Sequence, residues 1–119
     1  EQFKDKKISL LFGCGGNRDQ DKRSKMGKIA SEYSDKIYLT DDNPRYENPA
    51  RIREEVIGNL KNISEIGNRK LAIKKAISEL KRGELLLIAC KGHEKLQSIM
   101  GKNIPFDDVK IAKKYLQKK

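Results

Sequence analysis

The sequence predicts a single α/β domain, residues 1–119, with a mostly parallel sheet and helices on both faces. Apolar runs of strand length alternate along the chain with stretches whose apolar residues recur at helical spacing. The 119 residues suffice for one core, and they contain no repeat, linker or low-complexity segment. Strands separated by helices are expected to pair in parallel through right-handed crossovers, which places helices on both faces of the sheet.

The first half of the chain supplies two strands around one helix. Residues 8–13, ISLLFG, form an apolar run closed by glycine, as is typical of a buried strand. The helix that follows places four apolar residues on one face: Met26, Ile29, Ala30 and Tyr33. Residues 36–40, KIYLT, supply the second strand.

The middle of the chain contains two helices with recognisable caps. Asn48 can cap a helix that has Pro49 at its first position. Residues 62–66 form a weak third strand. Asn68 can cap the next helix, and Gly83 is expected to end it.

The last third begins with ELLLIA, residues 84–89, which is the clearest candidate for a buried strand. Residues 96–106 contain a glycine and a proline and predict a short hairpin or loop. A final helix is expected over residues 107–117.

The charge of the chain is strongly basic but dispersed. The formal net charge is +10, only seven of the 27 basic residues are arginine, and aromatic residues make up 6%. Scattered lysines without interleaved aromatics favour a solvated surface, so nucleic acid is not the expected partner. A basic nucleic-acid-binding α/β module stays as an alternative, and it predicts an affinity that falls steeply with salt.

The apolar runs, the N-terminal sequence and the cysteine usage predict a cytoplasmic protein. No apolar run approaches the roughly 18–20 residues that span a bilayer, and the N-terminal EQFKDKK lacks a signal-peptide centre. The missing initiator methionine predicts a processed or excised chain. Cys14 and Cys90 are too few for a disulfide framework and pair with no histidine in a zinc pattern, so we expect buried thiols and no metal site.

Three polar clusters each follow a predicted strand: GCGGNRD, DDNPR and CKGHE. In open α/β sheets ligands bind beyond the carboxyl ends of the strands, so the three clusters are expected to form one site. The segment TDDNPRYENP, residues 40–49, is unusually rigid and charged, with two prolines and three carboxylates. Its simpler interpretation is a turn that Asx hydrogen bonds and proline set.

The residue types in these clusters suit recognition of an amino acid. Arg18 and Arg45 can hold a carboxylate in bidentate geometry, and Asp42, Asn43 or Glu94 can hold an ammonium group.

Other residues in the clusters are less specific. GCGG matches neither a dinucleotide fingerprint nor a P-loop, so nucleotide binding by this chain alone is not indicated. Lys22 and Arg23 can meet a phosphate or face water, and His93 can be a base or a helix-end residue.

In this order and spacing, GCGGNRDQDKRSKMGKIA, TDDNPRYENP, CKGHEKLQ and IPFDD resemble the C-terminal domain of the Mur ligases, in the branch that adds meso-diaminopimelate. The resemblance covers nearly the whole chain. It implies a Rossmann-like fold and a cytoplasmic enzyme that builds peptidoglycan precursors. ATP, with Mg²⁺, phosphorylates a carboxylate of the UDP-linked muramoyl dipeptide, and the amine of the incoming amino acid then displaces phosphate to form an amide.

The resemblance also implies roles for single residues. Arg45, with Asp42 and Asn43 beside it, reads the distal carboxylate that lysine lacks. Arg18 helps hold a carboxylate, and Glu94 receives the ammonium group. Two further residues, Lys22 and Arg23, face the nucleotide phosphates.

The sequence departs from the family pattern in two ways. Cys90 stands where members usually have glycine, which preserves a backbone contact with the ligand but narrows the pocket. The P-loop and the UDP-binding domain are absent, so the chain is expected to be an excised domain that has no catalytic residue of its own and is inactive alone. A relative that adds lysine or another amino acid stays as an alternative, against which Arg45 argues.

Overall fold

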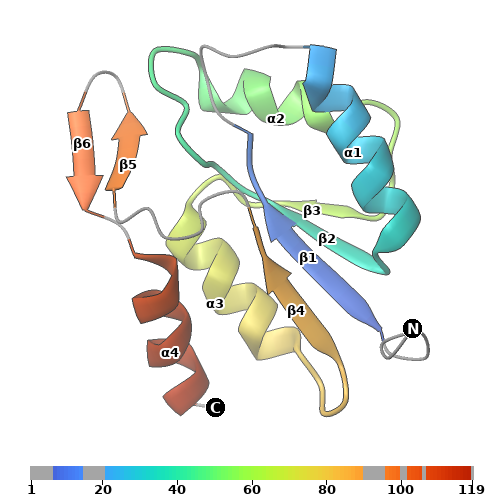
Figure 1. Ribbon diagram of the computed structural model, residues 1–119, viewed down its shortest axis with the longest axis vertical. Helices are drawn as coiled ribbons and strands as arrows, with labels where there is room; N and C mark the ends of the chain where they lie inside the picture. Colours follow the sequence, from blue (N-terminus) through green and yellow to red (C-terminus); the bar gives the residue numbers. More distant parts are fainter. Residues whose placement is uncertain (1–6, 15–20, 90–95, 100–101, 106, 119) are drawn as a thin grey trace.

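The computed structural model describes residues 7–14, 21–89, 96–99, 102–105 and 107–118 (Figure 1). The elements along the chain are β1 (Ile8–Phe12), α1 (Asp21–Tyr33), β2 (Lys36–Leu39), α2 (Pro49–Ile57), β3 (Ile63–Glu65), α3 (Arg69–Glu79), β4 (Leu85–Ile88), β5 (Leu96–Ile99), β6 (Lys102–Pro105) and α4 (Asp108–Lys118). The predicted alternation of strands and helices is confirmed, including the weak third strand and the terminal helix.

The main sheet is parallel and has the order β3-β2-β1-β4. Leu10 of β1 lies opposite Ile37 of β2 on one side and Leu87 of β4 on the other. The predicted hairpin is also present, because β5 and β6 pair antiparallel as a separate two-stranded sheet. The α/β class predicted from the alternation is therefore correct.

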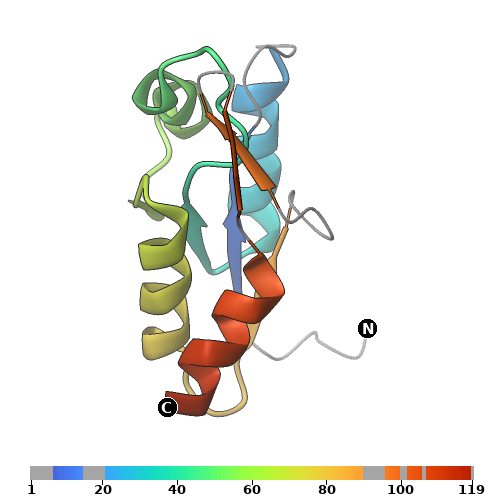
Figure 2. The ribbon, with the colours of Figure 1, turned by 90° about the vertical axis from the view of Figure 1, so that its left-hand side faces the viewer.

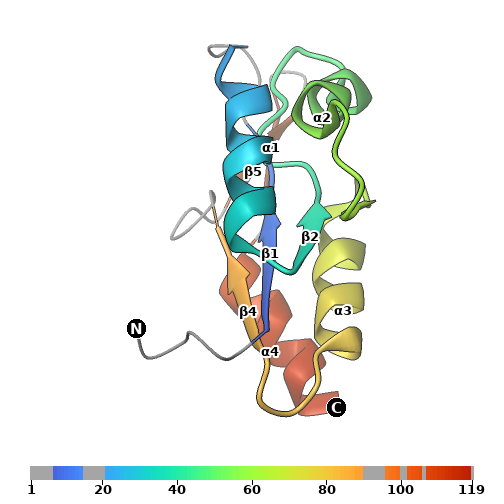
Figure 3. The same ribbon diagram turned by 90° about the vertical axis from the view of Figure 1, so that its right-hand side faces the viewer.

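Helices cover both faces of the main sheet, α1 and α2 on one and α3 and α4 on the other (Figure 1). Seen from two opposite sides, α4 lies in front of the strands in Figure 2 and α1 lies in front of them in Figure 3. Successive strand residues point to opposite faces, which divides the core in two. On one side Phe12 and Ile37 pack with Val56 of α2. On the other, Leu11 and Tyr38 pack with α3. The ends of the strands are thus fixed from both faces.

Both predicted helix caps are present. The Asn48 side chain accepts a hydrogen bond from the Ala50 amide at 2.9 Å, and the Asn68 side chain accepts one from the Leu71 amide at 3.0 Å. The prediction that Gly83 ends α3 is wrong, because the helix ends at Glu79. Gly83 instead takes a φ of 86° in the turn before β4, a conformation that glycine adopts without steric cost.

The expectation that ELLLIA forms a buried strand is also wrong. Among the described strands β4 pairs only with β1 and lies at the sheet edge, where Leu87 is 53% exposed. The predicted apolar face of α1 is likewise only partly covered, since Ile29 and Tyr33 are exposed. Between α1 and this edge lies an apolar hollow of about 220 Å³, lined by Leu10, Phe12, Met26, Ile29, Ala30 and Ala89.

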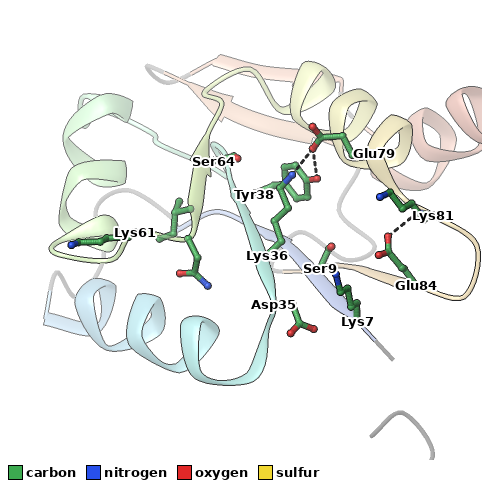
Figure 4. A pocket seen from close by; sticks show the side chains of 12 residues that line it. Lys7, Ser9, Asp35, Lys36, Tyr38, Lys61, Ser64, Glu79, Lys81 and Glu84 are labelled. Carbon is green, nitrogen blue, oxygen red and sulfur yellow. Dashed lines mark hydrogen bonds and ion pairs between the residues drawn. The ribbon is translucent and has the colours of Figure 1, made fainter. Parts of the chain in front are cut away.

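A polar hollow of about 490 Å³ lies near the amino ends of β1 and β2, on the α3 side of the sheet (Figure 4). At its wall the buried Tyr38 hydroxyl donates a hydrogen bond to the Glu79 carboxylate, and the Lys36 ammonium lies 2.7 Å from the same oxygen. This network is at the opposite end of the strands from Gly13, Asp41 and Ala89, at or directly after which the polar clusters begin in the sequence.

We expect Glu79 to contribute stability that is lost in acid. The hydrogen bond from Lys36, followed by that from Tyr38, lowers the pKa of the Glu79 carboxyl below its ordinary 4.5. A lowered folded-state pKa gives stability that is complete above the ordinary value and disappears as the pH falls through the folded-state value. Because the side chain is 39% exposed, solvent screening keeps the contribution below about 1 kcal/mol.

The measurement is the urea midpoint from neutral pH down to about pH 3. Glu79→Gln should show a shallower loss of stability below pH 4.5 than the parent chain. Glu54→Gln removes a carboxylate from the exposed surface of α2 and serves as the control. Parallel pH curves for Glu79→Gln and the parent would contradict the prediction.

Candidate functional site

The carboxyl ends of β1, β2 and β3 lie in direct backbone contact. The Thr40 amide donates to the Phe12 carbonyl at 3.0 Å, and the Asp41 amide donates to the Gly67 carbonyl at 3.3 Å. A Cβ placed on Gly13 would lie 2.5 Å from the Thr40 oxygen and 2.7 Å from the Asp42 nitrogen. Glycine at this position therefore allows the end of β1 to lie directly against the segment that follows β2.

The segment after β2 forms a partly buried turn. Asp42, Asn43 and Pro44 are buried, whereas Arg45 is partly exposed. Arg45 has a φ of 54°, and its Nη1 donates to the Asn43 carbonyl at 3.2 Å. A left-handed conformation is uncommon for a residue with a side chain, and such residues cluster at binding and catalytic sites.

Arg23 connects α1 to the second half of this turn. Its guanidinium, 2% exposed, lies 2.9 Å from a Glu47 oxygen and 2.6 Å from a Glu55 oxygen of α2. Burial lowers the pKa of Arg23, but the hydrogen bonds with Glu55 and Glu47 outweigh it and raise the pKa overall. In this conformation the guanidinium faces two carboxylates, and its contact with nucleotide phosphates stays a prediction.

Two further arginines hold Asp41, the residue that leads into the turn. Arg53 of α2 pairs with the Asp41 carboxylate and lies 2.8 Å from Glu65 of β3. Burial raises the pKa of the Asp41 carboxyl, while the hydrogen bond from Arg53 opposes that shift. On the other face, Arg69 donates to the Asp41 carbonyl at 3.0 Å. The turn is therefore anchored from α1, α2 and α3.

Sequence reasoning missed Arg53 and Arg69. In this lysine-rich chain only seven of 27 basic residues are arginine. The guanidinium is the cation best suited to partly buried, multidentate pairing. In a chain with so few arginines, each arginine was therefore a candidate for a buried ion pair, although the sequence does not show which carboxylate it binds.

Several predicted site residues lie outside the described part of the chain, namely Arg18, Cys90, His93 and Glu94. Lys22 lies in α1, whose first two side chains are also outside it. Cys14 is buried, as predicted, with its Sγ 3.7 Å from the Met26 sulfur. Of the predicted substrate-binding set, the structure therefore places Asp42, Asn43 and Arg45, and it brings them together in one turn.

A comparison with protein families matches residues 1–92 to the Mur ligase, glutamate ligase domain. The chain belongs to the Mur ligase family. A UDP-N-acetylmuramoyl-L-alanyl-D-glutamate–2,6-diaminopimelate ligase of Rickettsia rickettsii is 48% identical to this Mur ligase domain over 98% of the chain and 25% of the relative. The enzyme of the same name from Rickettsia conorii is 50% identical over 95% of the chain and 24% of the relative.

A solved structure supports the fold of the Mur ligase domain. It is that of a UDP-N-acetylmuramoyl-L-alanyl-D-glutamate–2,6-diaminopimelate ligase, with a TM-score of 0.90 and 34% identity over 94% of this chain and 24% of the solved one. The domain thus spans about a quarter of the length of these relatives. Within the part of the chain that the structure describes, no helix has both the length and the apolar character to cross a membrane.

Proposed function

We propose that this chain is the amino-acid-binding domain of a ligase that adds meso-diaminopimelate to UDP-N-acetylmuramoyl-L-alanyl-D-glutamate in the cytoplasm. The observation that carries the proposal is the anchored turn. In it Asp42 and Asn43 are buried, and Arg45, two residues after Asn43, has a left-handed backbone conformation. The relatives that share about half of its sequence carry the name of that ligase.

In the proposed complex Arg45 binds the distal carboxylate of diaminopimelate. A guanidinium matches the two oxygens of a carboxylate, and lysine offers no such group at that end. Asp42 and Asn43 supply oxygens for the neighbouring ammonium group, together with Glu94. Arg18 and Cys90 complete the amino-acid site in this proposal.

The reaction itself needs groups beyond this chain. The family's chemistry phosphorylates a carboxylate of the UDP-linked dipeptide with ATP, and the amine of diaminopimelate then displaces phosphate. The described residues bring together no group of three or more histidine, cysteine or acidic side chains that could hold a metal ion. We assign ATP and Mg²⁺ to the other domains of the ligase and propose that Lys22 and Arg23 face the phosphates, for which Arg23 would have to leave its partners Glu47 and Glu55.

The first test is an NMR titration of the labelled chain with meso-diaminopimelate and, separately, with lysine. We expect amide shifts at Arg18, at Asp42, Asn43 and Arg45, and at residues 92–94, with diaminopimelate alone. Equal shifts with lysine would contradict the selectivity of the turn. If neither ligand causes shifts, repeating the titration in the complete ligase distinguishes a site that needs other domains from a wrong assignment.

The second test replaces Arg45 with alanine in the complete ligase. Losing a charge-assisted hydrogen bond to the substrate should raise the KM for diaminopimelate roughly 10- to 100-fold. Arg51→Ala is the matched control, because it removes the same charge from an exposed position on α2. Equal effects of the two variants would refute the role of Arg45.

A further inference from the structure

We propose that Arg69 is a positioning residue for the amino-acid site, which it builds by holding the ends of β2 and β4 at a fixed separation. The inference rests on the proposed function for the identity of the substrate, but its geometry is independent of that identity. Arg69 opens α3 and is 2% exposed. It is thus a charged residue buried directly beneath the edge where the polar clusters begin.

The hydrogen bonds of Arg69 to backbone carbonyls reach two separate segments. Its Nη1 donates to the Asp41 carbonyl at 3.0 Å and its Nη2 donates to the Ala89 carbonyl at 3.3 Å. Asp41 immediately precedes Asp42 and the turn, and Ala89 immediately precedes CKGHE. One guanidinium therefore binds the first residue of DDNPR and the residue that directly precedes CKGHE.

β2 and β4 are not neighbours, because β1 lies between them. Two strand spacings separate such strands by roughly 9–10 Å. A planar guanidinium with diverging N–H groups can donate to both carbonyls across that gap, whereas a lysine ammonium is a compact point charge. An arginine at this position therefore suits a bridge between two segments, whereas a single contact at the start of a helix would not need a guanidinium.

Asp108 fixes the orientation of this guanidinium. Its two oxygens accept from Arg69 Nε at 2.8 Å and from Nη2 at 2.7 Å, and the carboxylate is itself buried. The bidentate pair neutralises the arginine charge and leaves Nη1 directed at β2. Asp108 begins α4, so the position of this helix is tied to the same junction.

Arg53 provides a natural comparison. It binds the Asp41 side chain and Glu65, and therefore connects β2 to β3. Neither of these two contacts reaches β4. Arg69 differs from Arg53 in its contact with Ala89. We therefore infer that Arg69, and not Arg53, fixes the distance between the ends of β2 and β4.

The test is a double-mutant cycle in the complete ligase, with the KM for meso-diaminopimelate as the readout. Arg45→Ala is introduced into the parent, into Arg69→Lys and into Tyr38→Phe. Tyr38→Phe removes a partly buried hydrogen bond to Glu79 at the far end of the strands, so it controls for a general loss of stability. A positioning role predicts that Arg45→Ala raises KM by about 30-fold in the parent and Tyr38→Phe, but less than about 3-fold in Arg69→Lys. Equal, additive penalties in all three backgrounds would overturn the inference.

A second measurement keeps the inference testable without activity. Hydrogen exchange of the segment 41–47 should accelerate in Arg69→Lys and in the charge-neutral variant Arg69→Met with Asp108→Leu, but not in Tyr38→Phe. Unchanged exchange in both Arg69 variants would overturn the positioning role, whatever the ligase does. If instead Arg45→Ala leaves the parent KM unchanged, the proposed function fails, and the exchange result still decides the role of Arg69.

Discussion

Replacing Arg69 alone with methionine should lower the free energy of unfolding by about 3–5 kcal/mol. The substitution leaves the Asp108 carboxylate buried without the guanidinium that binds both of its oxygens. Removing one partner of a buried ion pair costs this much, because the remaining charge has lost both its solvent and its counter-ion. Urea denaturation of the chain at neutral pH measures the loss.

The matched variant carries Arg69→Met together with Asp108→Leu. Replacing both members of a buried pair with apolar side chains is often close to neutral, so the double variant should recover most of the lost stability. Two carbonyls, those of Asp41 and Ala89, still lose their donor, and recovery is therefore incomplete. A double variant as unstable as Arg69→Met would show that the buried charge is not the source of the cost.

Gly13→Ala should destabilise the chain and, under the proposed function, weaken binding of diaminopimelate. The added Cβ would lie 2.5 Å from the Thr40 oxygen, 2.7 Å from the Asp42 nitrogen and 2.9 Å from the Asp41 carbonyl carbon. All three are backbone atoms, so the collision is relieved only by moving the turn away from β1. We expect a loss of about 1–3 kcal/mol in unfolding free energy and a rise in KM like that of Arg45→Ala.

Gly58→Ala is the control for this substitution. Gly58 has a φ of 49° at the end of α2, and a Cβ added there would meet no atom within 4 Å. Its substitution is strained by conformation alone, by about 1–2 kcal/mol, and it is remote from the turn in sequence. Gly58→Ala should therefore lower stability without changing KM. A Gly13→Ala ligase with the parent KM would contradict a functional role for the close approach of β1 to the turn.

Local patterns were enough to predict most of the fold. The alternation of elements, the two asparagine caps and the hairpin all follow from residues a few positions apart. The burial of β4 was predicted wrongly because an apolar run such as ELLLIA can form either a central or an edge strand. Only the order of the strands, which is a long-range property, decides between the two.

The candidate site was predictable in part for the same reason. The turn after β2 was evident from its prolines and charges, which are contiguous in the sequence. Its anchors were not, since Arg23 meets Glu55 across 32 residues and Arg69 meets Asp108 across 39. The left-handed conformation of Arg45 is also not evident from the sequence, because glycine or asparagine, the residues that usually adopt a positive φ, does not occupy that position.

If the proposed function holds, the anchoring of one turn from three helices has a consequence for how the ligase would change its substrate over evolution. Arg23, Arg53 and Arg69 reach the turn from α1, α2 and α3, so its shape depends on the packing of both faces of the sheet. Exchanging Arg45 alone would remove a contact without building a new pocket. We expect a lineage that switches to another amino acid to acquire compensating substitutions among these distant anchors, so that new specificity arises as a correlated set rather than through a single step.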